Sequence, residues 1–99
     1  MFVAVAVDAG SNTRAKEIAE ILVQYGFARA QRGLWESTAV THDTLKRLKR
    51  DLDKATDADD RLKFFQFPME ENLVLSFLRE KKWRRVVVRK DSFGLSRRY

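Results

Sequence analysis

Residues 2–8 read FVAVAVD and begin the series of predicted elements from which the fold class follows. The run is apolar and rich in valine, which is typical of a strand buried inside a sheet. It ends at Asp8, so a carboxylate stands at the carboxyl end of the predicted strand. The run is too short to span a membrane and lacks the basic start of a secretory signal. We therefore expect a cytoplasmic protein that has no membrane partner.

The residues that follow predict two helices with a short β segment between them. Residues 9–13 offer Ser, Asn and Thr as N-caps, and apolar residues then recur at helical spacing until Gly26. Residues 27–37 mix apolar and polar side chains around Gly33, which predicts either a short hairpin or one bent strand. The second helix is expected from Thr41 to near Thr56. Its apolar stripe is formed by Leu45, Leu48, Leu52 and Ala55.

The last third of the chain predicts a strand, a further helix and a final strand. The strand that begins this part of the chain contains Leu62, Phe64, Phe65 and Phe67, and Pro68 is expected to end it. Residues 70–82 predict a helix, because acidic residues precede lysines in the order that the helix dipole favours. The apolar face of this helix would consist of Leu73, Val74, Phe77 and Leu78. Residues 83–89 predict the last strand.

This order of elements is typical of an α+β, ferredoxin-like βαββαβ sandwich with an added C-terminal helix and strand. We expect one domain over residues 1–90, followed by a flexible or partner-docked tail over residues 91–99. A chain of 99 residues buries only about two thirds of its unfolded surface. A homodimer would increase that burial.

Basic residues are concentrated near the C-terminal end of the chain. The net charge is +6, of which residues 79–99 contribute +7 (nine Lys or Arg less Glu80 and Asp91), so residues 1–78 sum to −1. A basic end on a near-neutral body is typical of a protein that binds phosphate backbones, although solubility alone explains the same imbalance. The candidate nucleic-acid contacts are Arg79, Lys82, Arg84 and Arg85. Arg14 and Lys16 are added because the N-terminus of a helix also attracts phosphate.

Several classes of chemistry are excluded by the composition. The chain has no cysteine and one histidine, His42, which rules out thiolate chemistry and a multi-histidine metal site. The acidic run Asp57–Asp60 lacks the spacing of an EF-hand and is interpreted as a loop. The Lys46, Arg47, Lys49, Arg50 cluster is interpreted as a solvated helix face, because aspartates lie among its charges.

Three segments in one order resemble the small CRISPR-associated adaptation subunit. They are the strand end Val5–Asp8, the helix end Tyr25–Phe27 with RAQRGLWE at residues 29–36, and FFQFP at residues 64–68. The resemblance covers about residues 1–68. Gly33 stands where the family usually has Ser or Thr, so it is left out of the predicted site, and Trp35 stands where the family favours Phe.

The resemblance implies a symmetric homodimer between two dimers of the CRISPR integrase, a heterohexamer that holds duplex DNA for insertion as a spacer. It also implies magnesium-dependent endonuclease activity on DNA or RNA, as described for many members. The family's metal ligand corresponds to Asp8, and Arg29 and Trp35 match positions that members need for nuclease activity. For Trp35, a role in packing is supported at least as well. One carboxylate per chain is sparse for Mg²⁺, whereas two facing across a twofold axis are adequate. From the residues alone, the favoured interpretation of Asp8 is a helix cap or a turn residue, and the resemblance shifts the preference to a metal ligand.

Two other functions stay open from the sequence. One is a stand-alone ribonuclease of the virulence-associated protein D type, which shares this fold and would cleave without partners. The other is a non-catalytic nucleic-acid-binding module. The sequence does not separate binding from cutting, and our preference for binding rests on the single carboxylate that each chain offers for a metal.

Overall fold

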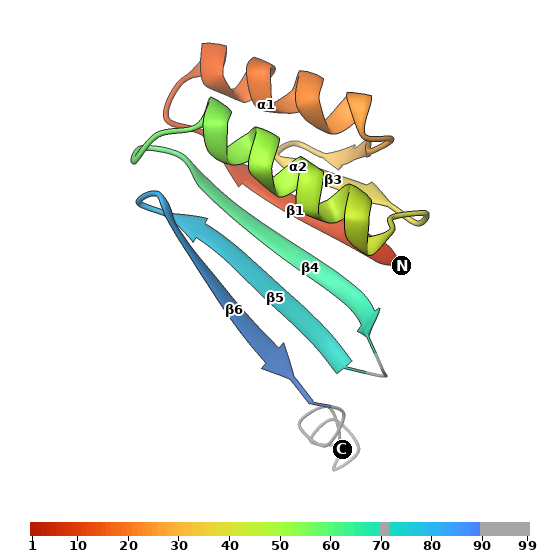
Figure 1. The fold of residues 1–99 in the computed structure, drawn as a ribbon. Helices are drawn as coiled ribbons and strands as arrows, with labels where there is room; N and C mark the ends of the chain where they lie inside the picture. Colours follow the sequence, from red (N-terminus) through yellow and green to blue (C-terminus); the bar gives the residue numbers. More distant parts are fainter. Residues whose placement is uncertain (70–71, 90–99) are drawn as a thin grey trace, which may run out of the picture.

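The computed structural model describes residues 1–69 and 72–89, and these form one antiparallel sheet with two helices. The elements follow in the order β1 (Phe2–Asp8), α1 (Asn12–Gln24), β2 (Ala28–Gln31), β3 (Leu34–Ser37), α2 (His42–Ala55), β4 (Arg61–Met69), β5 (Asn72–Arg79) and β6 (Lys82–Val88). Across the sheet the strands lie in the order β2-β3-β1-β4-β5-β6. Figure 1 shows both helices on one face of this sheet.

The predicted ferredoxin-like α+β fold is confirmed. Elements β1 to β4 give the βαββαβ order, with β1 in the middle between β3 and β4 and with every pair antiparallel. Residues 27–37 form the hairpin rather than the single bent strand. Gly33 turns this hairpin at φ +74°, a conformation that suits glycine, and its carbonyl oxygen accepts a hydrogen bond of 2.7 Å from the Val7 amide.

Both helices begin where their caps predict. The Ser11 hydroxyl accepts a hydrogen bond from the Arg14 amide, and the Thr41 hydroxyl accepts one from the Thr44 amide. The apolar stripes of the helices face β1 and β4, where they bury the core residues Val3, Val5, Ile18, Leu22, Leu48, Leu52, Leu62 and Phe64. Neither described helix is long and apolar enough to cross a membrane.

The predicted helix over residues 70–82 is wrong, because Asn72–Arg79 forms strand β5. Val74 and Leu78 are buried on the face of β5 beneath the helices, and Leu75 and Phe77 are half-buried on the opposite face. With apolar side chains on both faces, the strand shows no alternation, and its spacing also fits a helix. Residues 70–71 and the predicted tail 91–99 lie outside the described residues.

Strand β4 is also longer than expected. It continues through Pro68 to Met69, with a shift of register between Gln66 and Met69. Such an irregularity accommodates a proline that donates no hydrogen bond to the ladder. The added C-terminal unit is therefore a β-hairpin of β5 and β6 that widens the sheet beyond β4.

The turn between β5 and β6 is backbone-strained. Its two residues, Glu80 and Lys81, have φ values of 53° and 63°, in the left-handed region that glycine and asparagine tolerate best. Lys81 has a compensating role, since its ammonium donates hydrogen bonds to the carbonyls of Asp53 and Thr56 at the end of α2. It also lies 3.3 Å from the Asp53 carboxylate. The turn thus connects the hairpin to the helical layer.

Replacing Glu80 by asparagine is expected to raise the free energy of unfolding by about 0.5–1 kcal/mol, because asparagine adopts positive φ more readily. Urea denaturation would measure the change. Lys81→Asn is the matched control: it relieves the same backbone angle but removes the contacts with α2, so it should bring no gain. Equal stabilisation by both variants would contradict this account of the turn.

Candidate functional site

The two faces of the sheet differ in what covers them. One, the helix face, packs against α1 and α2. The other, which we call the open face, carries neither helix and presents apolar side chains from β1, β4, β5 and β6. On it Phe67 is 42% exposed and Val86 is 48% exposed, and their neighbours Phe65 and Leu75 are half-buried. A contiguous exposed apolar surface of this kind is typical of an interaction site.

Basic side chains occupy the other end of the open face in two rows across the strands. In the first row Asp8 stands opposite Arg61, Arg61 opposite Arg79, and Arg79 opposite Lys82. In the second row Lys63 stands opposite Phe77, which stands opposite Arg84. Directly opposite residues of antiparallel strands share a face. We call this set of five cations the cationic rows: Arg61, Lys63, Arg79, Lys82 and Arg84.

Two of these cations, Arg61 and Lys63, were not among the residues predicted from the sequence. The Lys63 ammonium lies 5.2 and 5.0 Å from the ring centres of Phe65 and Phe77, at cation–π distance. The alternation of Arg61, Lys63, Phe65 and Phe67 in a strand was the available signal, since every second residue faces the same way.

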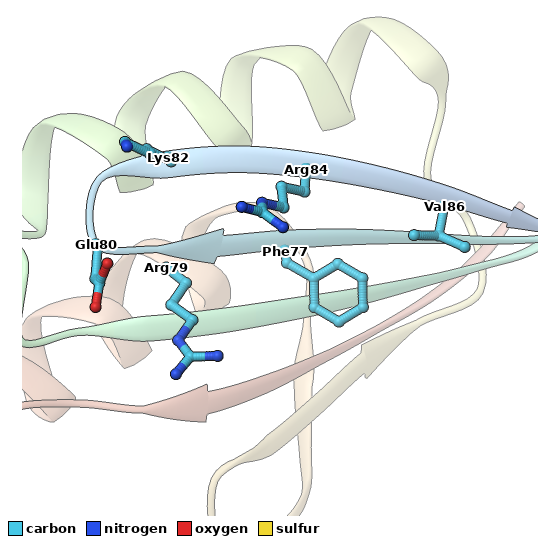
Figure 2. A pocket seen from close by; sticks show the side chains of 6 residues that line it. All are labelled: Phe77, Arg79, Glu80, Lys82, Arg84 and Val86. Atoms are coloured by element: carbon cyan, nitrogen blue, oxygen red, sulfur yellow. The ribbon is translucent and has the colours of Figure 1, made fainter.

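An open pocket of about 450 Å³ lies at the β5–β6 end of the cationic rows. Figure 2 shows that its lining comes from β5, β6 and the turn between them: Phe77, Arg79, Glu80, Lys82, Arg84 and Val86. Three of the four C-terminal cations predicted to bind nucleic acid therefore share one pocket. The fourth, Arg85, stands opposite Ser76 on the helix face.

Asp8 lies where the sequence predicts, at the end of β1. Its neighbours Val7 and Ala9 pack against the core, so the exposed Asp8 side chain belongs to the open face. The other two predicted catalytic residues lie elsewhere. Trp35 stands opposite Val5 on the helix face, packed against the core, and Arg29 stands opposite Trp35. The structure does not bring these three residues together on one face of a single chain.

Arg14 has acidic partners. Its guanidinium lies 3.4 Å from a carboxylate oxygen of Asp57 and 3.7 Å from one of Asp60. Asp60 is 1% exposed and accepts hydrogen bonds of 2.8 Å from the amides of Gly10 and Asp57. The acidic run at 57–60 is thus a loop, as predicted, and it holds the segment that follows Asp8. Lys16 is exposed on α1.

The donor set for a metal ion is small. No group of three or more His, Cys, Asp or Glu side chains that could hold a metal occurs among residues 1–69 and 72–89. Asp8 is the exposed carboxylate at the end of β1, and a cation, Arg61, stands directly opposite it. Asp8 therefore contributes a single carboxylate and is not part of a larger group of ligands within the described residues.

These features define a small ferredoxin-like protein whose open sheet face is covered by neither helix and is apolar at one end and cationic at the other. The family model for CRISPR associated protein Cas2 matches residues 1–86, which is most of the chain, and the chain belongs to this family. A search of curated proteins yields no significant match. The family membership confirms the resemblance seen in the sequence and gives the protein a CRISPR-associated function in defence.

Proposed function

We propose that this protein is the adaptation subunit that pairs with itself through the open face, binds duplex DNA and bridges two dimers of the CRISPR integrase in the cytoplasm. The observation that carries the proposal is the open face, which combines exposed apolar side chains with Asp8 and the cationic rows. Membership of the Cas2 family supports the choice of integrase as partner. Bridging requires a symmetric particle, and a homodimer provides one.

The apolar end of the open face supplies the contact between the two copies. Phe67 and Val86 are large side chains left more than 40% exposed, and burying them against the same patch of a second copy removes apolar area from water. A twofold axis makes such a contact self-complementary. The cationic rows would then extend from both copies as a track for phosphates.

The same symmetry completes the metal site. The Asp8 side chains of the two copies would together provide two carboxylates for Mg²⁺, which prefers oxygen ligands and retains several waters. When bound, the ion would polarise a phosphodiester or activate a water molecule. Asp8 would hold the ion, and the cationic rows would neutralise the phosphate. We place binding before cleavage in this proposal, because each chain offers one carboxylate here.

The dimer is tested by two neighbouring residues of β6. Val86 lies on the open face opposite Leu75, whereas Val87 is 45% exposed on the helix face opposite the buried Val74. Val86→Glu should convert the dimer to a monomer in sedimentation equilibrium, because it buries a charge in the interface. Val87→Glu adds the same charge and should leave the dimer intact. A wild-type protein that sediments as a monomer would overturn the proposal.

Binding and catalysis are separated by Asp8→Ala. This variant should bind labelled duplex DNA as tightly as the wild type, since Asp8 carries no positive charge, and should lose any magnesium-dependent cleavage. Neutralising Arg79, Lys82 and Arg84 should weaken binding and flatten its salt dependence. Co-purification with the integrase tests the bridging function. Cleavage of RNA by the dimer alone, with no binding to the integrase, would favour the stand-alone ribonuclease instead.

A further inference from the structure

A second basic surface lies on the helix face, between α2 and β6, and the proposed dimer does not use it. Two adjoining hollows of about 360 and 350 Å³ meet there, and both are lined by Lys49 and Arg85. Lys46 lines the first hollow and Arg50 the second. We call this surface the α2–β6 groove and define it by these four cations.

Lys49 is the innermost cation of the groove, and its hydrogen bonds go to neutral groups. Its ammonium donates to the amide oxygen of Gln66 (3.2 Å) and to the hydroxyl of Ser76 (2.9 Å). It also lies 5.4 Å from the ring centre of Phe64 and 5.5 Å from that of Trp83. No carboxylate within the described ranges forms a salt bridge with it.

Carboxylates do not neutralise the groove. Asp53 reaches the second hollow, but its carboxylate is bound by the Lys81 ammonium and the Trp83 indole, both at 3.3 Å. Asp43 lines the first hollow, as Lys46 does. The four cations of the groove, with Arg84 also lining the second hollow, therefore lie beside one carboxylate that has no such partner in the described part of the chain, which leaves a concentrated positive potential.

We infer that the α2–β6 groove binds the phosphate backbone of a nucleic-acid duplex, as a contact separate from the open face. The inference rests on the proposed function. If two copies pair through their open faces, their helix faces point outward, so the groove of each copy stays accessible. Arginine guanidinium groups such as those of Arg50 and Arg85 match phosphate geometry, and cations one helical turn apart suit a regularly repeating polyanion.

The partial burial of Lys49 makes duplex binding at the groove depend on pH in a way that can be measured. Burial, and then the charge of Arg85, lowers the pKa of Lys49 to about 8. A phosphate placed beside the ammonium would favour its charged form, so binding should take up a proton near this pH. The other ionisable groups facing it are His42, Asp43, Lys46 and Arg50 on the same helix, Asp53 at its end, and Arg84 and Arg85 on β6.

The test uses full-length wild-type protein, the double variant Lys49→Met/Arg85→Gln and a labelled DNA duplex of about 30 base pairs. The double variant should bind about tenfold more weakly at low salt, with a salt slope lower by about two. The matched control is Lys54→Met/Arg32→Gln, which removes the same two charges at exposed positions outside the groove. Sedimentation should show a dimer for both variants.

Each outcome decides between the inference and the proposed function. A wild-type protein that binds no duplex overturns both. A groove variant that binds as tightly as the control variant overturns the inference alone and leaves the open face as the binding surface. Displacement of the duplex by polyglutamate as readily as by unlabelled duplex would overturn the choice of phosphate in favour of an acidic protein.

The pH dependence adds a readout that a merely structural residue would not give. Between about pH 7.5 and 9 the affinity of the wild type should fall several-fold as Lys49 loses its proton. Lys49→Arg keeps a permanent charge and should bind over the same range with a flatter profile. Identical pH profiles for the two proteins would count against a phosphate contact at Lys49.

Discussion

Asp60→Asn should lower the free energy of unfolding by about 2–3 kcal/mol. The Asp60 carboxylate is buried, and each of its oxygens accepts a hydrogen bond of 2.8 Å from a backbone amide, Gly10 for one and Asp57 for the other. Asparagine has one side-chain oxygen, so only one of the two backbone amides could still donate to it. The other backbone amide would face the side-chain NH₂ group, which is also a donor, in a buried place where water cannot accept the hydrogen bond. The variant also loses the ion pair with Arg14.

The same carboxylate predicts how stability depends on acid. Burial raises the pKa of Asp60, but the hydrogen bonds from Gly10 and Asp57 and the charge of Arg14 outweigh it and lower the pKa below its usual value of 3.8. The unfolded chain therefore takes up this proton first as pH falls. The contribution of Asp60 is complete above about pH 4 and disappears as pH falls through the lower pKa of the folded state.

Urea denaturation of the wild type and Asp60→Asn at neutral and acidic pH would measure both effects. The two proteins should differ most near neutral pH and converge in acid. Asp59→Asn is the matched control, since Asp59 is adjacent and exposed and should change stability by less than about 0.5 kcal/mol. An equal loss in both variants would show that the loop needs charge rather than these hydrogen bonds.

The Asp60 contacts also determine where Asp8 lies. The Gly10 amide that donates to Asp60 follows Asp8 by two residues, and a Cβ on Gly10 would lie 2.7 Å from the Cβ of Asp59. The 57–60 loop, which leads from α2 into β4, therefore packs closely against the end of β1. Loss of this packing in Asp60→Asn would loosen the proposed metal ligand without touching it.

The first two thirds of the fold could be predicted from the sequence because local signals agree there. The caps Ser11 and Thr41 stand before clean helical periodicities, and a buried valine-rich strand precedes them. The prediction for the β5 segment was wrong because the local sequence pattern there does not distinguish a strand from a helix. Leu73, Val74, Phe77 and Leu78 face alternately toward and away from the helices, and only the pairing with β4 and β6 distinguishes that strand from a helix.

A site residue could be placed from the sequence only where a single predicted strand was enough to locate it. Asp8 could be placed because it ends an obvious strand, but its neighbours Arg61 and Arg79 join it through the register of β1, β4 and β5. The pairing of Arg14 with Asp57 spans 43 residues of sequence. Arg84 and Arg85 lie on opposite faces of β6, a strand that the sequence did predict, but the face that each residue occupies depends on the pairing of β6 with β5.

Lys49→Met should raise the free energy of unfolding at neutral pH by about 1 kcal/mol, although it removes two hydrogen bonds. The lowering of the Lys49 pKa from 10.5 to about 8 means that the folded protein disfavours this charge. The shift corresponds to roughly 3 kcal/mol, which water around the half-buried ammonium reduces to about 1–2 kcal/mol. Gln66 keeps the hydrogen bond from Ser76, and methionine retains the contact with Phe64 and Trp83.

The pH dependence of stability distinguishes this mechanism from better packing alone. Between about pH 8 and 10.5 the unfolded chain holds the Lys49 proton that the folded protein has released, so the wild type should gain stability as pH rises. Tyr25 opposes this above about pH 10, since its hydrogen bond to Asp51 raises the pKa of its phenol. The window from about pH 8 to 10 is therefore the informative one.

Urea denaturation across that window should show a rising curve for the wild type and a flatter one for Lys49→Met, with Lys54→Met following the wild type. A variant that is less stable than the wild type at pH 7 would mean that the Lys49 contacts, rather than its buried charge, dominate. If the variant is more stable and yet binds duplex DNA more weakly, misfolding cannot explain the lost affinity. The protein would then retain an unfavourable charge in the α2–β6 groove because a polyanion requires it.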